Sequence, residues 1–571
     1  MKSHRLANTV GIILLIVAVI AYCQYFLSYL YYYIEQFGLF QFTADYARNE
    51  LFQVGGVARY ISAFIIQFFV HPYVGAIVSG VLSLVIFSAM YSCIRKIAGR
   101  MYGAWLLSTL PMCTLLWAGN DYSFHFVEGA LAMIFSLWVL RGYLSIYKTW
   151  LKIIYFIVCV SAGYYGFGLY IGAFAFGAFS VEFFSNPKKN WWSILYLFVF
   201  LYPWENTYHH YMLPVLPTYY MPLFSVFVCM IMVYIYSRIL KDAMQKISFM
   251  LVRVIEVVLS LTLFYTGMRH YYPASNLDAM QMDYYTRVGE WDNLLRCSSP
   301  NAARNTMNMC CQNLALSHMG RLSEDFMFYP QRGVKGLLLN WNRYVNSSFL
   351  LSDIYYHIGA VALSQEMAFE GMIASEHAIS RRMLIRLIQT NLILGHEKVA
   401  LKYIRLLSRT YAYAEKASYY KQFADNPELI VKDKDLYIRK QCISGTRGLT
   451  NSHNPFEYVR QILEVSPVYE PAAAYYGSAS LMTRNIQEFR YVADAYLRSH
   501  KTMPVSFQEA LIILYENDEG RWVDYGISKE VQDNFNRFKE SLNRVKTSKI
   551  GMNDLKKEFG GTYWYYFMFK Q

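Results

Sequence analysis

The 571-residue chain is 55% hydrophobic and 16% charged, with a formal net charge of +13. Residues 1–272 contain 17 Lys/Arg and 9 Asp/Glu, whereas residues 273–571 contain 36 and 31. The basic residues of the first part cluster at the ends of apolar runs. Those of the second part are nearly balanced by acids, so we expect no nucleic-acid partner. The sequence has no Walker loop and no G-x-G-x-x-G after a strand, so we also expect no nucleotide partner.

The N-terminal apolar run, from Leu6 to Ile34, is far longer than the roughly 7–15 residues of a signal-peptide core. No A-x-A-like site ends it, so we predict an uncleaved first helix. About 20 apolar residues are needed to cross a bilayer. The chain offers about nine such spans. They are 8–33, 73–94, 102–118, 124–141, 151–166, 168–184, 190–203, 221–240 and 248–267. The sequence leaves open whether 151–184 is two spans or one broken hairpin around Gly163–Gly168.

Most basic residues that flank these spans fall on one side, which the positive-inside rule assigns to the cytoplasm. They are Lys2, Arg5, Arg95, Lys96, Arg100, Arg141, Lys148, Lys152, Lys188, Lys189, Arg238, Lys241 and Lys246. Nine spans that start inside must end outside. We therefore predict a bacterial inner-membrane bundle over residues 1–272, in contact with lipid, and a periplasmic domain over 273–571.

The connections on the opposite side contain most of the acids of the first part. The polar residues that map there are Glu35, Asp45, Glu50, Arg59, Asp121, His125, Glu128, Glu205, His209, His210, Arg269 and His270. In the first connection, Val57, Ile61, Ile65 and Phe68 recur at helical spacing. This pattern predicts an amphipathic interfacial helix within about 46–70.

The second part has a helical pattern throughout, which makes the predicted fold class all-α. Residues 384–412 form the clearest unit, an apolar helix, a Gly395-His396 turn and a second helix with Ala400. This unit resembles a tetratricopeptide repeat, and 456–497 and 305–328 are looser copies. The resemblance implies an α-solenoid that binds a periplasmic protein or peptide. An irregular all-α domain is the alternative. We expect the aromatic residues 562–569 to pack in its core rather than at the membrane boundary.

The membrane part has acidic residues on its outer loops, beside an interfacial helix. In this layout it resembles the GT-C superfamily of membrane glycosyltransferases. The animal O-mannosyltransferases with tetratricopeptide repeats share this plan of bundle plus outward repeats. The resemblance covers about the first 130 residues. Asp45 would match the acid of the first loop, and Asp121, in Gly119-Asn120-Asp121-Tyr122, the acid of the second. Residues 1–272 contain no D-x-D or E-x-D pair, which leaves a divalent metal cofactor open.

The resemblance implies transfer of a sugar from a polyprenyl-phosphate donor to a periplasmic acceptor. Asp45 first and Asp121 second would take the acceptor proton. Arg59, Arg269, His209 and His210 would bind the lipid phosphate. Glu35, Glu50, Glu128 and Glu205 are the other acids of this face.

Each of these residues also has a structural interpretation. Asp45 can cap a helix, Asp121 can serve its turn, and Arg59 can extend toward headgroups. His209 and His210 can be an interfacial pair. The rival function is a non-catalytic, membrane-anchored scaffold for envelope assembly.

Over its whole length the chain resembles a family of membrane proteins of Bacteroides-type bacteria with no assigned activity. The residues that carry this resemblance are FTADY, GGVARYISAFIIQFFVHPYVGA, NLALSHMGRLSEDFMFY and FGGTYWYYFMF. Glu182 and Glu256 lie near the inner face, and a proton pathway there would make transport a third hypothesis. It is the weaker one, because the chain shows no clear inverted repeat. Arg253 is at pairing distance from Glu256, which favours a structural ion pair there.

Overall fold

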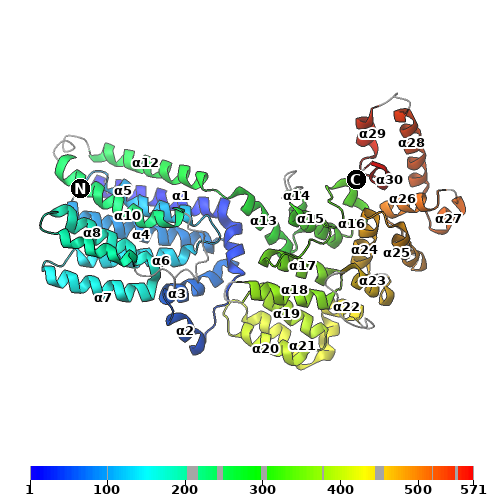
Figure 1. Cartoon of the computed structure of the whole chain (residues 1–571), viewed down its shortest axis with the longest axis horizontal. Coiled ribbons are helices and arrows are strands. Elements are labelled where there is room, and N and C mark those ends of the chain that lie inside the picture. The colour runs from blue at the N-terminus through cyan, green and yellow to red at the C-terminus, as the bar shows by residue number, and fades with distance from the viewer. Residues whose placement is uncertain are drawn as a thin grey trace. The chain divides into compact units, whose positions relative to one another are not determined.

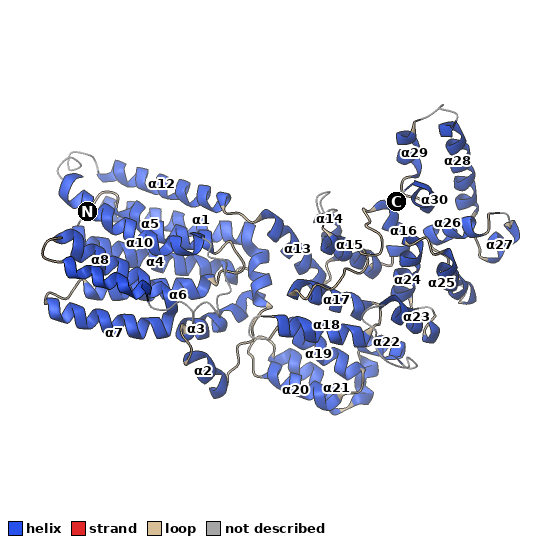
Figure 2. Cartoon of the chain, in the orientation of Figure 1, coloured by secondary structure: helices blue, strands red, loops and turns tan. Residues whose placement is uncertain are grey.

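The computed structural model describes residues 2–569 except 100, 202–216, 241–248, 298–304, 376–378, 444–454, 468, 500, 517 and 547–550. Within these residues every regular element is a helix, and β-structure is limited to the isolated bridges Phe37–Ser380 and Arg332–Val334 (Figure 2). The all-α class is therefore confirmed. Two compact units are present, Met1–Glu35 with Leu39–Leu277, and Gln36–Gly38 with Asp278–Gln571 (Figure 1).

The first unit is a bundle of mostly apolar helices. Its α-helices are α1 (Lys2–Glu35), α2 (Ala44–Leu51), α3 (Gly56–Ile66), α4 (Val74–Ala98), α5 (Ala104–Ala118), α6 (Phe126–Tyr143), α7 (Thr149–Phe167), α8 (Gly172–Ser185), α10 (Pro217–Ile235) and α12 (Phe249–His270). Shorter helical segments are η1 (Gln67–Val70), η2 (Gly168–Ile171), η3 (Trp191–Leu201) and η4 (Tyr236–Leu240).

Six stretches of the described residues are long and apolar enough to cross a membrane. They are Asn8–Glu35, Val74–Ala98, Phe126–Tyr143, Thr149–Ser185, Tyr220–Arg238 and Met250–His270. The predicted count of about nine is not confirmed. Helix α5 has 15 residues, roughly 22 Å at 1.5 Å per residue, which is shorter than a bilayer's hydrocarbon core. Residues 191–201 form a 3₁₀-helix, and the segment after them lies outside the described residues.

The stretch Thr149–Ser185 is folded back on itself as a helical hairpin. Lys152 near its start and Glu182 near its end form an ion pair, with 2.5 Å between Nζ and Oε1. The chain reverses at Gly168, whose φ of +71° is readily adopted only by glycine. Here the backbone also approaches Gly55, whose N–H donates to the Tyr165 carbonyl at 2.8 Å. The region 151–184 therefore consists of two antiparallel helices.

One end of the bundle gathers the basic residues. Arg141 Nε donates to Ser92 Oγ at 2.9 Å, which joins the ends of α6 and α4. Arg253 pairs with Glu256 at 2.6 Å, as the sequence predicted. The Glu256 carboxylate also accepts the Gly103 N–H at the start of α5. Glu182 and Glu256 thus each have a basic partner, which favours a structural role for them.

The other end of the bundle gathers the connections richer in acids. Tyr33 at the end of α1 packs against Tyr122, with 5.8 Å between ring centroids. Asn120 Nδ2 lies 3.5 Å from the Met268 carbonyl of α12. The contacts thus separate the two sets of loops as the charge pattern predicted. Which end faces the cytoplasm stays a prediction.

The described helices of the second unit have at most 18 residues. After α13 (Ala274–Val288), which includes the last residues of the first unit, they are α14 (Trp291–Cys297), α15 (Thr306–His318), α16 (Leu322–Asp325), η6 (Phe326–Phe328), α17 (Val345–His357), α18 (Val361–Ala374), α19 (Arg381–Ile393), α20 (Glu397–Ser408), α21 (Ala414–Asp425), η8 (Pro427–Lys432), α22 (Lys434–Ile443), α23 (Pro455–Val465), α24 (Glu470–Met482), α25 (Ile486–Arg498), α26 (Val505–Leu514), α27 (Glu519–Asp524), α28 (Lys529–Lys546), α29 (Met552–Phe559) and α30 (Tyr563–Phe569).

Helices α17 to α21 pack in chain order, each against the next. The turn between α19 and α20 lies at Gly395, with φ +76°, and Ala400 is fully buried between helices. However, α16 also packs against α24 and α26, which lie far along the chain. In a solenoid each repeat contacts only its neighbours, so this unit is not a simple solenoid. The tetratricopeptide identity of the helix pairs stays a prediction.

The C-terminal aromatic segment packs in the core, as predicted. Tyr563 and Trp564 of α30 are almost fully buried. The Tyr563 N–H donates to Glu509 Oε2 at 2.6 Å, and Trp564 Nε1 donates to the Glu509 carbonyl at 2.9 Å. These bonds fasten α30 to α26 inside the large hydrophobic core of the unit.

Candidate functional site

The predicted interfacial helix of 46–70 is divided into α2 and α3 by a turn at Gly55, whose φ is +76°. Thr43 caps α2, since its Oγ1 accepts the Tyr46 N–H at 3.2 Å. Asp45 lies in the first turn of α2 with an exposed side chain. The N-cap position that Asp45 could have filled thus belongs to Thr43.

Arg59 of α3 holds the corner between α2 and α3. Its Nη1 donates to Gln53 Oε1 at 2.5 Å and its Nη2 to the Val54 carbonyl at 3.3 Å. Its Nη1 also lies 3.8 Å from Glu50 Oε2. Arg59 is buried, so its guanidinium orders this loop and does not extend toward headgroups.

Helix α3 turns its polar side inward. Arg59 and Ser62 are buried, whereas Ile61 and Phe64 are exposed, and the helix packs against α6 and α7. A helix with its apolar side outward is suited to contact with lipid. The predicted amphipathic character is thus present, in a helix of 11 residues.

Asp121 serves the turn between α5 and α6. Its Oδ1 accepts the Ser123 N–H at 2.9 Å, the pattern of an Asx-turn. Two residues further on, His125 Nδ1 lies 3.3 Å from Glu128 Oε1. The structure therefore pairs His125 with Glu128, and it pairs Arg59 with Glu50.

Two of the remaining predicted residues, Glu35 and Arg269, are described by the structure. Glu35 is buried at the end of α1, and the Arg269 guanidinium lies 5.8 Å from the ring centroid of Tyr272. Glu205, His209 and His210 lie outside the described residues. Among the residues that the structure does describe, no group of three or more His, Cys, Asp or Glu is arranged to hold a metal ion.

The second unit contains a buried polar site that the sequence did not indicate. It begins with Gln36–Gly38, the segment that follows α1 and belongs to the second unit; we call this segment the strap. Gly38 N–H donates to the Ile379 carbonyl at 3.3 Å, and Arg381 N–H donates to the Gln36 carbonyl at 3.2 Å. The strap thus pairs with 379–381 like a short β-strand.

Side chains reinforce this pairing. The Phe37 ring stacks on Phe349, with centroids 5.9 Å apart and planes at 19°. Gln36 is almost fully buried, and its Oε1 accepts from Arg382 Nη1 at 3.2 Å. The strap therefore contributes both an aromatic ring and a hydrogen-bond acceptor to the interior of the second unit.

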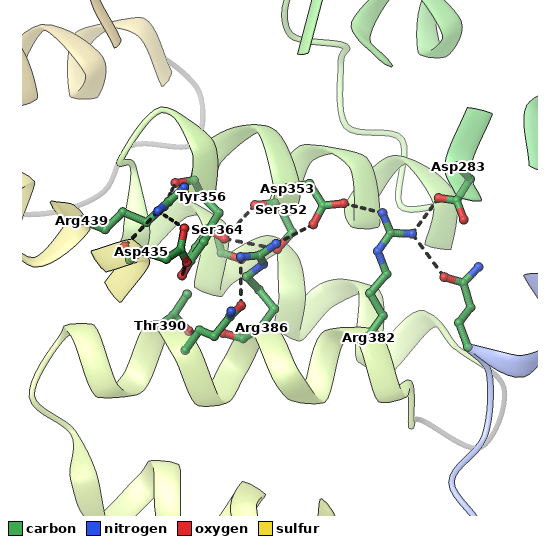
Figure 3. Close-up of polar contacts among 12 residues, drawn as sticks. Asp283, Ser352, Asp353, Tyr356, Ser364, Arg382, Arg386, Thr390, Asp435 and Arg439 are labelled. Carbon is green, nitrogen blue, oxygen red and sulfur yellow. Dashed lines mark hydrogen bonds and ion pairs between the residues drawn. The ribbon is translucent and has the colours of Figure 1, made fainter. Parts of the chain in front are cut away.

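Arg382 links three distant parts of the chain (Figure 3). Besides Gln36, it binds Asp283 of α13, at 2.6 Å, and Asp353 of α17. Asp353 in turn accepts from Arg386, one turn further along α19, at 2.8 Å. Burial alone would raise the pKa of Asp353, but Arg382 and Arg386 outweigh it and hold this pKa below its ordinary value.

The network continues to α22 through Tyr356. The Arg386 and Arg439 guanidinium carbons lie 3.7 and 4.1 Å from its ring centroid. Its hydroxyl donates to Asp435 Oδ2 at 2.6 Å, and Arg439 Nη1 pairs with Asp435 Oδ1 at 2.5 Å. With Arg382, Asp283 and Asp353, the network contains three cations and three anions, so its charge is balanced. The sequence feature that could have indicated this network is the pair Arg382 and Arg386, which are one helical turn apart among the apolar residues of α19.

A groove of about 630 Å³ lies over α23, α24 and the start of α25. Its charged lining consists of Glu457, Arg460, Glu464 and Glu488, three acids against one base. Tyr476, also in the lining, donates to Glu488 Oε2 at 2.5 Å. Arg460 lies 3.8 Å from both Glu464 and Glu488. The groove therefore has an excess of negative charge with partly exposed carboxylates.

His357 is a buried histidine next to Tyr356. Its Nε2 lies 2.8 Å from Ser317 Oγ, and its ring stacks on His318 at 3.7 Å. Burial, and then the proximity of His318 and Arg439, keep the pKa of His357 well below its ordinary value. This packing therefore favours the neutral form of the His357 ring over the charged form.

One family model, described as a family of unknown function (DUF6057), matches residues 2–570, and the chain belongs to that family. No curated protein and no solved structure matches the chain.

Replacing His357 by Gln should make the stability of the protein less sensitive to acid. An unfolded histidine takes up a proton near pH 6.5, whereas folded His357 stays neutral, so acid favours the unfolded state. We expect the thermal unfolding midpoint of His357→Gln to fall less between pH 7 and pH 5 than that of the native protein. Thermal unfolding of the full chain in detergent at both pH values measures this.

Replacing Glu509 by Gln is a control, because it should change the acid sensitivity in the opposite direction. Burial raises the pKa of Glu509 to about 8, so its stabilising effect is present at low pH and is lost as the pH rises through about 8. Glu509→Gln should therefore make the midpoint fall more between pH 7 and pH 5. Equal falls in the native protein and both variants would contradict this description of the two groups.

Proposed function

We propose that this chain is a membrane-anchored helical scaffold that binds a cationic segment of a partner protein. The observation that carries the proposal is the groove over α23–α25. Its volume of about 630 Å³ is within the range of ligand-binding clefts. Its three carboxylates and one guanidinium favour a ligand with positive charge.

Two further features support a scaffold. The first unit contains six stretches that are long and apolar enough to cross a membrane, which suits an anchor. The strap ties the residues immediately after one of these stretches into the second unit. The second unit would thereby be linked closely to the membrane anchor.

Reversing one charge in the groove should weaken binding of a cationic peptide. The probe is a fluorescent octapeptide of alternating Lys and Gly, and the receptor is the full chain in detergent. We expect Glu464→Lys to weaken binding at least tenfold, which is about 1.4 kcal/mol. Glu464 is suited to this test because its side chain is 56% exposed. Fluorescence anisotropy gives the dissociation constants.

The matched control is Glu540→Lys, which makes the same charge change on the exposed side of α28. It should bind the peptide like the native protein. An equal loss of peptide affinity in both variants would rule out the groove as the binding site. Equal binding of an alternating Glu and Gly peptide would also rule it out.

A second function is sugar transfer from a polyprenyl-phosphate donor to a periplasmic acceptor, as in the GT-C superfamily. One observation favours it: Asp45 is exposed while Thr43 caps α2, which leaves the carboxylate available as a general base. The carboxylate of Asp121, by contrast, serves its own turn.

If the chain transfers sugar, Asp45→Asn should abolish the activity. A general base contributes about 10²–10⁴-fold to rate, so we expect at least a hundredfold loss. Asp121→Asn should retain activity, because an amide oxygen can still accept the Ser123 N–H. Transfer of radiolabelled sugar in membranes with equal expression of the three proteins measures this. No transfer by the native protein with a broad panel of donors would rule against the enzyme.

A further inference from the structure

A group of exposed apolar and aromatic side chains lies on α18 and on the loop before α17. Phe369 and Ile373, one helical turn apart on α18, are 46% and 53% exposed. Trp341 and Tyr344 of the loop are 37% and 72% exposed. Single exposed apolar residues are common on protein surfaces. Whether this group indicates a binding surface therefore depends on its position within the fold.

Residues next to members of this group in the sequence pack where the strap is held. Phe37 of the strap packs on a cluster with Phe349 at its centre, and Val345 and Met372 are also packed against this cluster. Val345 follows Tyr344, and Met372 precedes Ile373. Trp341 is fixed to the same place, because its Nε1 donates to Ser348 Oγ at 3.0 Å.

The strap follows directly on an apolar stretch that is long enough to cross a membrane. Gln36 is the residue after Glu35, which ends the apolar stretch Asn8–Glu35 of 28 residues. Such a helix is about 42 Å long at 1.5 Å per residue. A bilayer is about 30 Å thick in its hydrocarbon core and about 40–45 Å with its headgroups. If α1 crosses the membrane, Phe37 is therefore held within a few residues of the headgroup region.

The chemistry of the group fits that region. Trp and Tyr concentrate at membrane–water interfaces, because each combines an apolar ring with a polar atom. Exposed Arg343 lies with its guanidinium carbon 6.0 Å from the Trp341 ring centroid, where it could reach lipid phosphates.

We propose that Trp341, Arg343, Tyr344, Phe369 and Ile373 form a lipid-contact surface, which docks the second unit on the headgroup–acyl boundary of the membrane that α1 crosses. The contact would restrain the helical unit beside the membrane by insertion of side chains, in addition to the covalent links. It requires neither a ligand in the groove nor sugar transfer.

Site-specific photo-crosslinking tests this surface. Phe369→p-benzoylphenylalanine, and separately Tyr344→p-benzoylphenylalanine, are made in the full chain and reconstituted in phosphatidylethanolamine-containing nanodiscs. Val523→p-benzoylphenylalanine is the control, because Val523 is 78% exposed on α27, outside the proposed surface.

After irradiation we expect a lipid adduct at positions 369 and 344, detected by intact-protein mass spectrometry, with at least fivefold less adduct at position 523. Two readout positions guard against a single variant that disturbs the fold. Lipid adducts at neither 369 nor 344, or equal adducts at all three positions, would overturn the proposal.

Discussion

The second unit depends on how the Arg382 guanidinium is satisfied in a buried site. Its partners are Gln36, Asp283 and Asp353, which come from three distant parts of the chain. A buried cation without partners costs several kcal/mol, so these partners must all be in place when α19 packs. One side chain thereby fixes the strap, α13 and α17 against α19. Arg386 and Tyr356 extend the same constraint to Asp435 and Arg439 of α22.

This constraint makes the strap a structural part of the second unit. The strap follows a helix that is long and apolar enough to cross a membrane, yet its hydrogen bonds and its aromatic ring belong to the second unit. The helical unit is therefore assembled from two separate parts of the chain. Such an arrangement suits a platform that must stay at a membrane. It is compatible with the scaffold proposed above, and Arg59 and Asp121 have structural partners of their own.

The features that sequence could predict are local ones. Apolar runs gave the helices of the first unit, Gly395 marked a real turn, and the Asx-turn at Asp121 follows from its own short motif. The interfacial segment was only partly predicted, because the helical spacing of apolar residues did not reveal the break at Gly55. The strap and the Arg382 network were missed, because ion pairs between residues far apart in sequence leave no periodic signal. The count of spans was uncertain for a related reason, since short apolar runs such as α5 do not reveal whether they cross a membrane.

The most direct test is the free energy of unfolding of the second unit in the full chain, measured by pulse proteolysis in detergent. Arg382→Met should lower it by about 3–5 kcal/mol, because Asp283 and Asp353 lose a buried partner. Arg537→Met breaks an exposed pair with Glu558 and should cost at most about 1 kcal/mol. A large loss confined to Arg382→Met is the predicted result. Equal small losses in both variants would contradict the central role of the Arg382 network.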